Sequence, residues 1–236
     1  MLLERTAQNA AQDIGLQIIR TEVPVENAAT MKRNNFFLIF SVFCFSMIAI
    51  ERIIGSYLVN YSLSTLFAQL GILFLGLFFV YRKDLRTTLR ELNIPGNLKT
   101  AISWTAIGLV VIFVGGIIIG LIATEAKIND QSKVVEKVNE FSYEIILMAI
   151  ILAPIGEELL FRGFLTKRFG VIISALIFGA VHLAYGSYFE IIGIVYIGLV
   201  LAYVFQKTKS LTPCILIHFL HNLFNLLAMI ILRGAS

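Results

Sequence analysis

Three charged side chains interrupt an apolar run from about Tyr143 to Leu165: Glu157, Glu158 and Arg162. Inserting one charge into hydrocarbon costs about 2.5 to 3.5 kcal/mol, so charges within such runs are usually functional. On a helix, Glu158 precedes Arg162 by four residues, which favours an ion pair. Glu157 points about 100° away and has no such partner in its own helix. We expect Glu158 and Arg162 to support the helix and Glu157 to remain available for chemistry.

A second set of polar side chains follows in two later apolar runs. In the run over about 171–185, Phe178 and His182 are four residues apart and share a helical face. The run over about 211–232 carries one narrow polar stripe among leucines, isoleucines and phenylalanines, made of His218, His221, Asn222 and Asn225. Because this stripe cannot face lipid, it must face protein or water.

Depth in the bilayer relates these residues to one another. At 1.5 Å per residue, counted from the expected cytosolic boundary, four of them lie about 12 to 20 Å deep: Glu157, His182, His218 and Asn222. Three helices would thus bring an acid, two imidazoles and an amide to one layer. Convergent polar groups in a buried layer are typical of a functional site.

The chemistry open to such a site is limited. The sequence has no serine or cysteine nucleophile motif, no glycine-rich phosphate loop and no HExxH zinc signature. A carboxylate can take a proton from water, and imidazole and amide groups can stabilise the oxyanion of a tetrahedral intermediate. Hydrolysis of an amide bond by activated water is therefore the predicted reaction.

The three motifs together resemble those of a known family. Glu157-Glu158-x-x-x-Arg162, Phe178-x-x-x-His182 and His218-x-x-x-Asn222 are similar to the motifs of the CAAX prenyl protease and bacteriocin-processing family of intramembrane proteases, also called the Abi or CPBP family. The resemblance covers residues 143–232. It implies that Glu157 activates water and His182 assists, that His218 and Asn222 bind the oxyanion, and that Glu158 and Arg162 hold the first helix in place.

Two points stay open at this level. His221-x-x-x-Asn225 also fits the third motif. We prefer His218 because Pro213 precedes it by five residues, a spacing similar to the family's, and because its depth fits the layer. We expect Phe178, His221 and Asn225 to surround the site. The resemblance allows catalysis without a metal, which we favour, or with zinc. A zinc ion would be held by two imidazoles and a carboxylate, from Glu157, His182 and His218.

Composition predicts an all-α, polytopic integral membrane helix bundle. Of 236 residues, 58% are hydrophobic and 14% charged, against about 25% charged in soluble domains. Seven apolar runs are long enough, or nearly so, to cross a bilayer. They are approximately Asn35–Leu58, Leu63–Tyr81, Ala101–Ala123, Tyr143–Leu165, Val171–Tyr185, Phe189–Phe205 and Leu211–Leu232.

Basic residues predict the topology and the domain limits. Thirteen of the nineteen lie in segments that would all be cytosolic if the N-terminus is inside. We expect a cytosolic N-terminal extension over 1–33, a transmembrane domain over 34–236, and a catalytic core over about 143–232. Glu190, at the outer edge of the sixth run, is expected to be solvated. Cys44 and Cys214 have neither redox nor zinc spacing, and nucleic-acid binding is not expected.

These observations predict an intramembrane endopeptidase of a bacterial cell membrane. Its substrate would be a membrane-associated peptide or protein that enters from the membrane or the cytosolic side, such as a prenylated CAAX-type tail or a bacteriocin- or pheromone-type peptide. The alternatives are a non-proteolytic membrane partner or bacteriocin self-immunity protein, and a proton-coupled transporter. A transporter of this kind would show repeated halves, and no repeat is present.

Overall fold

The computed structural model describes most of the chain after residue 27. The described residues are 28–54, 61–81, 84–128, 130, 132–139, 142–183 and 186–234. Most of the expected N-terminal extension therefore lies outside the described residues. Within them every regular element is helical, so the expected all-α class is confirmed.

The helices follow one another with short connections. They are α2 (Ala28–Ile54), α3 (Tyr61–Val80), α4 (Leu85–Glu91), α5 (Leu98–Glu125), α6 (Ser132–Asn139), α7 (Tyr143–Leu147), η1 (Met148–Leu152), α8 (Ala153–Glu158), η2 (Leu159–Thr166), α9 (Lys167–Ala180), α10 (Tyr188–Thr208) and α11 (Leu211–Gly234). Each of the seven apolar runs coincides with a helix or a series of helical segments. The short helices α4 and α6 were not expected, because they lie in polar connections.

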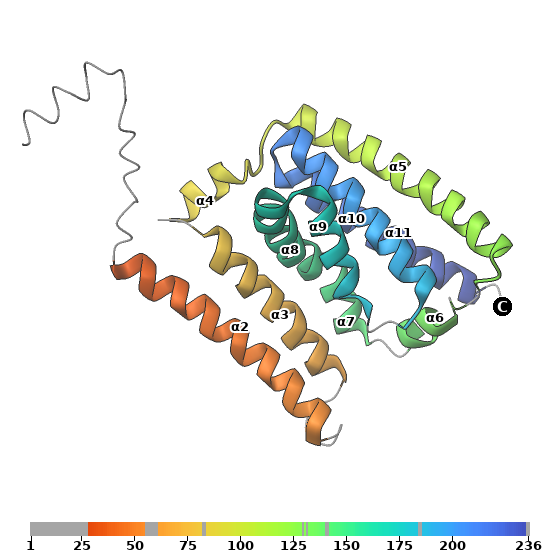
Figure 1. The fold of residues 1–236 in the computed structure, drawn as a ribbon, viewed down its shortest axis with the longest axis horizontal. Helices are drawn as coiled ribbons and strands as arrows, with labels where there is room; N and C mark the ends of the chain where they lie inside the picture. Colours follow the sequence, from red (N-terminus) through yellow and green to blue (C-terminus); the bar gives the residue numbers. More distant parts are fainter. Residues whose placement is uncertain are drawn as a thin grey trace, which may run out of the picture.

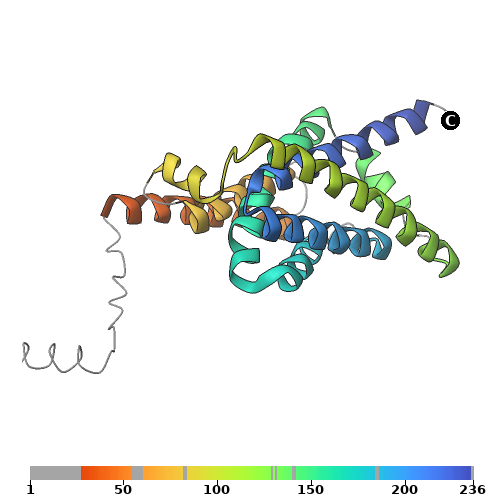
Figure 2. The ribbon, with the colours of Figure 1, turned by 90° about the horizontal axis from the view of Figure 1, so that it is seen from above.

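The segments α8, η2 and α9 lie at the centre of the bundle. On one side they pack against α3, which runs beside α2; on the other side are α10, α11 and α5 (Figures 1 and 2). The helix that carries Glu157 and Glu158 is thus covered on both sides by other helices, and its charges are kept from lipid.

Three helices are long and apolar enough to cross a membrane: Leu98–Glu125, Tyr188–Thr208 and the Leu211–Met229 part of α11. A fourth is added if Ser64–Val80 and Leu85–Glu91, bent by 86°, count as one span. These counts of candidate spans refer to the described residues only. The protein is therefore an integral membrane protein, while the count of seven spans stays a prediction.

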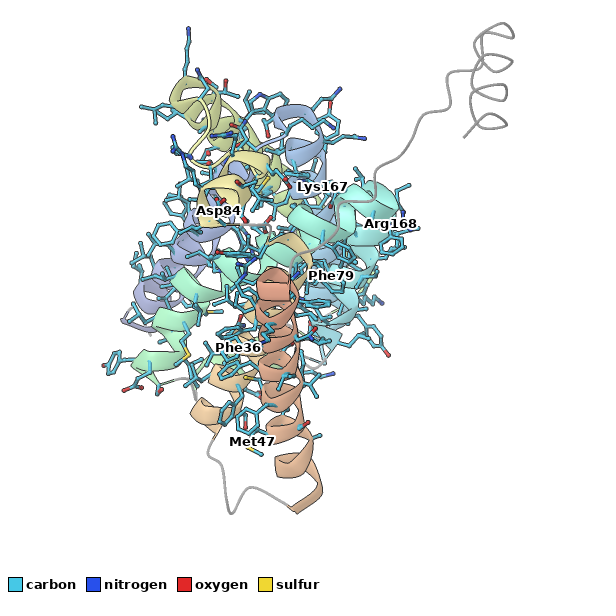
Figure 3. All side chains as sticks on the ribbon, turned by 90° about the vertical axis from the view of Figure 1, so that its left-hand side faces the viewer. Phe36, Met47, Phe79, Asp84, Lys167 and Arg168 are labelled. Atoms are coloured by element: carbon cyan, nitrogen blue, oxygen red, sulfur yellow. The ribbon has the colours of Figure 1, made fainter. Side chains whose placement is uncertain are left out.

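Hydrogen bonds join neighbouring connections at the two ends of the bundle. At one end Leu211 N–H donates to Leu92 O, joining the turn between α10 and α11 to the turn after α4. At the other end Asp130, between α5 and α6, accepts from Ser187 before α10. Figure 3 shows Asp84, Lys167 and Arg168 gathered toward one end and Met47 toward the other.

Proline shapes the helix that carries the two glutamates. Four segments, α7, η1, α8 and η2, follow one another with right-handed helical backbone at each junction, and η1 and η2 are π-helical. In η1 the N–H of Ala153 bonds Met148 O, five residues back. The next carbonyl, of Ala149, would need the N–H of Pro154, which proline lacks. Glu157 and Glu158 therefore stand between two π-helical stretches, which are rare and often found at functional sites.

A glycine turns the chain sharply after this helix. Gly170 has a φ of +83°. Residues that carry a Cβ rarely adopt this conformation, whereas glycine adopts it readily. The kink lets the rest of α9 run back alongside η2, against which it packs. In the same region the Ser174 hydroxyl donates to the carbonyl of Phe161 at 3.0 Å and ties the two segments together.

Two facing glycines bring α3 against α8, next to the glutamates. A Cβ added at Gly156 would lie 3.1 Å from Cα of Leu73, and one added at Gly76 would lie 3.1 Å from the backbone N of Leu160. Both contacts are with backbone, which cannot move aside as a side chain can.

We predict that Gly156→Ala destabilises the bundle by about 1 to 3 kcal/mol, the usual cost of overpacking. The matched control is Gly193→Ala on α10, because a Cβ there meets no atom within 4 Å. Removing a helical glycine at an open position stabilises by about 0.5 to 1 kcal/mol. Thermal unfolding of both purified variants in detergent checks this; equal shifts for both would contradict the close approach.

Candidate active site

One carboxylate oxygen holds three helical segments together at the centre of the bundle. Oε1 of Glu158 accepts from Nη1 of Arg162 at 2.8 Å and lies 2.9 Å from Nδ1 of His218 on α11. Glu158 and Arg162 are fully buried, and His218 is 7% exposed. The predicted Glu158–Arg162 pair is thus present, but Glu158 does more than expected, because it also binds His218.

The Arg162 guanidinium has further contacts that hold it in place. Nη2 donates to the carbonyl of Gly198 on α10 at 3.3 Å. Cζ lies 4.5 Å from the centre of the Phe178 ring on α9, a cation–π contact. Gly198 allows this close approach, since a Cβ there would lie 3.2 Å from Cα of Ala175. The charge of Arg162 is therefore compensated by one carboxylate, one carbonyl and one ring, each from a different helical segment.

The contact with Glu158 determines which nitrogen of His218 carries a proton. An ionised carboxylate only accepts hydrogen bonds, so Nδ1 must be the donor. In a neutral ring, Nε2 is then an acceptor. Nε2 lies 3.9 Å from Oε2 of Glu157, too far for a direct hydrogen bond. Glu158 thus aims the second nitrogen of His218 at Glu157.

Glu157 is the buried acid without a cationic partner of its own. Its side chain is 5% exposed. Among the described residues, no donor satisfies its Oε2, and the same holds for Oε2 of Glu158. The two acids differ in their cationic partner, because Oε1 of Glu158 accepts from Arg162 whereas Glu157 has no arginine or lysine partner among the described residues. A buried acid without such a partner requires an explanation, such as a role in chemistry. The sequence predicted that Glu158, and not Glu157, pairs with Arg162.

Asn222 lies one turn beyond His218 on α11, and its amide is already in use. Nδ2 donates to the carbonyl of Ala149 at 2.9 Å. This is the carbonyl left without an N–H partner by Pro154, so Asn222 supplies the missing donor. The amide therefore joins α11 to η1 and contributes to the π-helical geometry below the glutamates. The Asn222 side chain also hydrogen-bonds the imidazole of His221.

His182 lies beside Phe178, as their spacing predicted, but just beyond the end of the helix. The helix α9 ends at Ala180, so His182 lies in the turn after it, half-buried. Its Nδ1 is 2.7 Å from the carbonyl of Phe178. The Phe178 ring contacts both imidazoles, with centroid distances of 4.9 Å to His182 and 6.0 Å to His218. His182 is thus separated from His218 by Phe178, and its predicted role stays a prediction.

The alternative pair of the third motif lies away from the glutamates. His221 Nε2 is 3.1 Å from Nδ2 of Asn225, and its ring is 6.0 Å from that of Phe113 on α5. The structure therefore places His218, and not His221, beside Glu157 and Glu158.

A metal site does not form from the present positions of these residues. Within the described part of the chain, no three His, Cys, Asp or Glu side chains are grouped closely enough to hold a metal ion. The set considered for zinc, Glu157, His182 and His218, is divided by the Phe178 ring.

A cavity of about 690 Å³ opens beside the site, between α5, α6, α7, α10 and α11. It reaches Ala149 and Asn222, and its other polar lining comes chiefly from His221, Asn225 and Glu190. The expectation that Glu190 is solvated is wrong, because its side chain is half-buried and lines this cavity. The sequence did not reveal this because Glu190 stands at a helix start, where acids are common.

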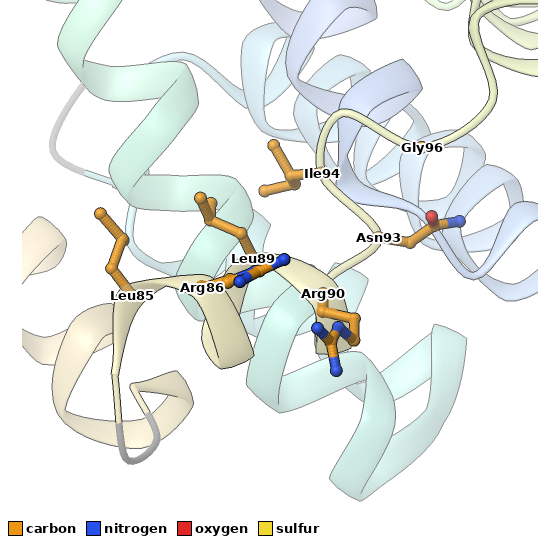
Figure 4. A pocket seen from close by; sticks show the side chains of 7 residues that line it. All are labelled: Leu85, Arg86, Leu89, Arg90, Asn93, Ile94 and Gly96. Atoms are coloured by element: carbon orange, nitrogen blue, oxygen red, sulfur yellow. The ribbon is translucent and has the colours of Figure 1, made fainter.

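A second cavity, of about 750 Å³, lies at the opposite end of the bundle. Its lining includes Arg86 and Arg90 of α4 and Ile94 and Gly96 of the following turn (Figure 4). Both arginines are exposed, and none of the predicted site residues lines this cavity. We therefore assign it no part in the site.

Comparisons with known proteins agree with the resemblance read from the motifs. Residues 139–224 match the family described as type II CAAX prenyl endopeptidase Rce1-like. They include Glu157, His182, His218 and Asn222. The similarity of this region to the CAAX protease family is thereby confirmed.

The chain is also similar to a relative described as an uncharacterized protein from Mycoplasma capricolum subsp. capricolum. The two are 30% identical over 143 residues, which cover 53% of this chain and 43% of the relative. The match therefore spans less than half of the relative's length. No solved structure matches the chain.

The buried Glu158–Arg162 ion pair leads to a prediction about the free energy of unfolding. Glu158→Gln leaves the charge of Arg162 without its carboxylate, and Arg162→Met leaves Glu158 without its guanidinium; each should cost about 3 to 5 kcal/mol. The double variant Glu158→Leu/Arg162→Met should recover much of this loss, because apolar pairs often replace buried ion pairs without penalty. Thermal unfolding in detergent measures all three, with exposed Glu125→Gln as control. Single variants as stable as the control would refute the supporting role.

Proposed function

We propose that this protein is an intramembrane endopeptidase in which Glu157 activates water to hydrolyse a peptide bond. The observation that carries the proposal is the buried carboxylate of Glu157, which does not share in the Glu158–Arg162 ion pair and whose Oε2 lies 3.9 Å from Nε2 of His218. The Rce1-like match over residues 139–224 supports the same class of reaction. The catalytic core is proposed to be 143–232.

In the first step, a water molecule hydrogen-bonded to Glu157 loses a proton to the carboxylate. The water oxygen attacks the carbonyl carbon of the scissile bond and forms a tetrahedral intermediate. Glu158 supports this step at a distance, because its bond to Nδ1 fixes the tautomer and orientation of His218. Arg162 in turn holds Glu158 in place. We propose that His182, whose Nδ1 is engaged by Phe178, assists the water through Nε2.

In the second step, the intermediate collapses. The negative charge on the former carbonyl oxygen is stabilised by His218 and by the remaining amide hydrogen of Asn222. For this, His218 acts as the imidazolium, which donates from Nε2 to the oxyanion while Nδ1–H stays bonded to Glu158. The C–N bond breaks, and the proton held by Glu157 passes to the leaving amine. The carboxylate is thereby restored for the next turnover.

The substrate is proposed to be a membrane-associated peptide or protein. The site is enclosed by helices of an integral membrane protein, and the neighbouring cavity is lined largely by apolar side chains. A CAAX-type tail, or a bacteriocin- or pheromone-type peptide, would fit this setting. The proposed topology has the N-terminus in the cytosol of a bacterial cell.

Replacement of the base is the direct test of this function. Glu157→Gln keeps the size of the side chain but cannot take up a proton, so cleavage should fall by about 10² to 10⁴-fold, the usual contribution of a general base. Peptide termini in membranes of cells expressing wild type or variant, compared by mass spectrometry, give the measurement. Termini produced by the wild type should disappear.

The control for this comparison is Glu125→Gln, an exposed acid at the end of α5. It should leave the termini unchanged. The Glu157→Gln protein must also reach the membrane in equal amount and unfold at a similar temperature. Termini that persist in the variant would show that Glu157 is not the base. If no termini depend on the wild-type protein and Glu157→Gln still complements a deletion strain, the protein is a binding partner or immunity protein.

Metal content separates the two catalytic possibilities. In the absence of a metal requirement, purified protein should hold much less than one zinc per chain, and a strong chelator should leave cleavage unchanged. Elemental analysis of the wild type and of His218→Ala provides the comparison. One tightly bound zinc per chain, lost in His218→Ala together with activity, would overturn the mechanism without a metal.

A further inference from the structure

The carboxylate of Glu190 stands on the wall of the 690 Å³ cavity, which we call the α5–α10–α11 cavity after the helices that line most of it. Glu190 lies in the first turn of α10. Among the described residues no donor hydrogen-bonds its side chain; its electrostatic partner there is His182, which is a cation only when its imidazole is protonated. A half-buried carboxylate in this position needs a positive or hydrogen-donating partner.

The start of α10 does not require this carboxylate. An acid three residues after a serine at a helix start often binds back to the free backbone amides. Here Ser187 Oγ accepts from the N–H of Glu190 at 3.1 Å, and Asp130 accepts from the N–H groups of Tyr188 and Phe189. The exposed amides of the first turn are thus satisfied by other residues, and the Glu190 side chain is free to face the cavity.

Asp130 can accept these backbone hydrogen bonds throughout the neutral pH range, because its carboxyl stays ionised. Desolvation raises the pKa of its carboxyl, but hydrogen bonds from Tyr188, Ser187 and Phe189 and the nearby charge of Lys133 outweigh it and lower the pKa below 3.8. The group therefore stays ionised well below neutral pH. The backbone amides at the start of α10 are therefore bonded to Asp130 and Ser187, and they do not need the carboxylate of Glu190.

The rest of the cavity offers no cation to Glu190. Its described lining contains no lysine or arginine and is mostly isoleucine, valine, phenylalanine and glycine. Apolar walls of this kind suit the long aliphatic stem of lysine or arginine, which packs against them while the charged end reaches a carboxylate. A charge pair within such walls is screened little by solvent.

The cavity is also connected to the proposed reaction centre. Asn222 and Ala149, which are hydrogen-bonded to each other beside the glutamates, form part of its lining. Glu190 interacts with His182, which we propose to assist the water. A group bound at Glu190 would therefore belong to a substrate residue close to the scissile bond.

We propose that Glu190 forms a specificity subsite for a lysine or arginine side chain of an otherwise apolar peptide substrate. This inference rests on the proposed endopeptidase function for its biological meaning. The binding preference itself does not depend on cleavage and is tested separately.

The first test measures the charge selectivity of the cavity. Gly193 lies one turn after Glu190 and lines the cavity, and an added side chain there meets no atom within 4 Å. In Gly193→Cys, we compare the rates of modification by two methanethiosulfonates of similar size, one with a trimethylammonium group and one with a sulfonate. Any effect of Glu190 on the reactivity of the thiol itself cancels in the ratio of the two rates.

The ratio of cationic to anionic rates should fall about tenfold when Glu190→Gln is added, as expected for loss of a nearby charge in a poorly solvated cavity. Gly120→Cys on α5 is the matched control, because it is equally open but does not line the cavity. The ratio there should not respond to Glu190→Gln. Cys44 and Cys214 are fully buried and give the background measured in wild type. An unchanged ratio at Gly193→Cys would overturn the proposal.

The second test uses a ligand of the proposed chemistry. Two acetylated heptapeptide amides are compared: one has six leucines around a central lysine, and the other has six leucines around a central norleucine. We measure how well each peptide protects the Gly193→Cys thiol from modification by a neutral methanethiosulfonate. Protection by the lysine peptide should be at least about fivefold stronger, in Glu157→Gln as well as in active protein. Charge reversal by Glu190→Lys should abolish this preference. Equal protection by both peptides would refute the subsite.

The two proposals fail in different ways. If Glu157→Gln leaves cleavage intact while the lysine peptide still protects, the catalytic assignment is wrong and the cation-binding cavity stands. If Glu157→Gln abolishes cleavage but neither test depends on Glu190, the enzyme stands and the subsite is wrong.

Discussion

The structure depends on one carboxylate oxygen that serves two donors in a dry interior. Oε1 of Glu158 receives Arg162 from its own helix and His218 from α11. Either partner alone would leave a buried charge or a poorly fixed imidazole, and both are costly. With both in place, η2 and α11 are held at one distance and the imidazole has one orientation. The neighbouring Glu157 therefore faces an imidazole of fixed orientation but takes no part in the Glu158–Arg162 ion pair.

The backbone is adapted to the same requirement. Pro154 and the π-helical register leave the Ala149 carbonyl without a partner, and Asn222 supplies one from α11. Gly156 lets α3 approach the same helix, so it is covered on the side away from α11. A side chain thus supplies the donor that the irregular helix lacks at Ala149. The cost of irregularity inside a membrane is compensated locally, where the polar groups gather.

Much of the architecture was predictable from the sequence, because membrane spans are long and uniform in composition. The apolar runs coincide with helices, and the charged motif shows that Glu158 pairs with Arg162. The two π-helical stretches were not predictable, since periodicity assumes a regular helix. The helix end before His182 was not predictable for a similar reason, because counting residues could not show that α9 ends at Ala180. Glu190 was overlooked because its environment is formed by α5 and α11, which are distant in sequence.

The central claim, that Glu158 orients His218 toward Glu157, can be measured directly because the chain has only three histidines. Nitrogen-15 NMR of histidine-labelled protein reports which ring nitrogen carries the proton, and His182→Gln and His221→Gln variants assign the signals. The account predicts a protonated, hydrogen-bonded Nδ1 in His218 whose signal changes in Glu158→Gln. An unprotonated Nδ1, or a His218 signal that is the same in wild type and in Glu158→Gln, would contradict the account.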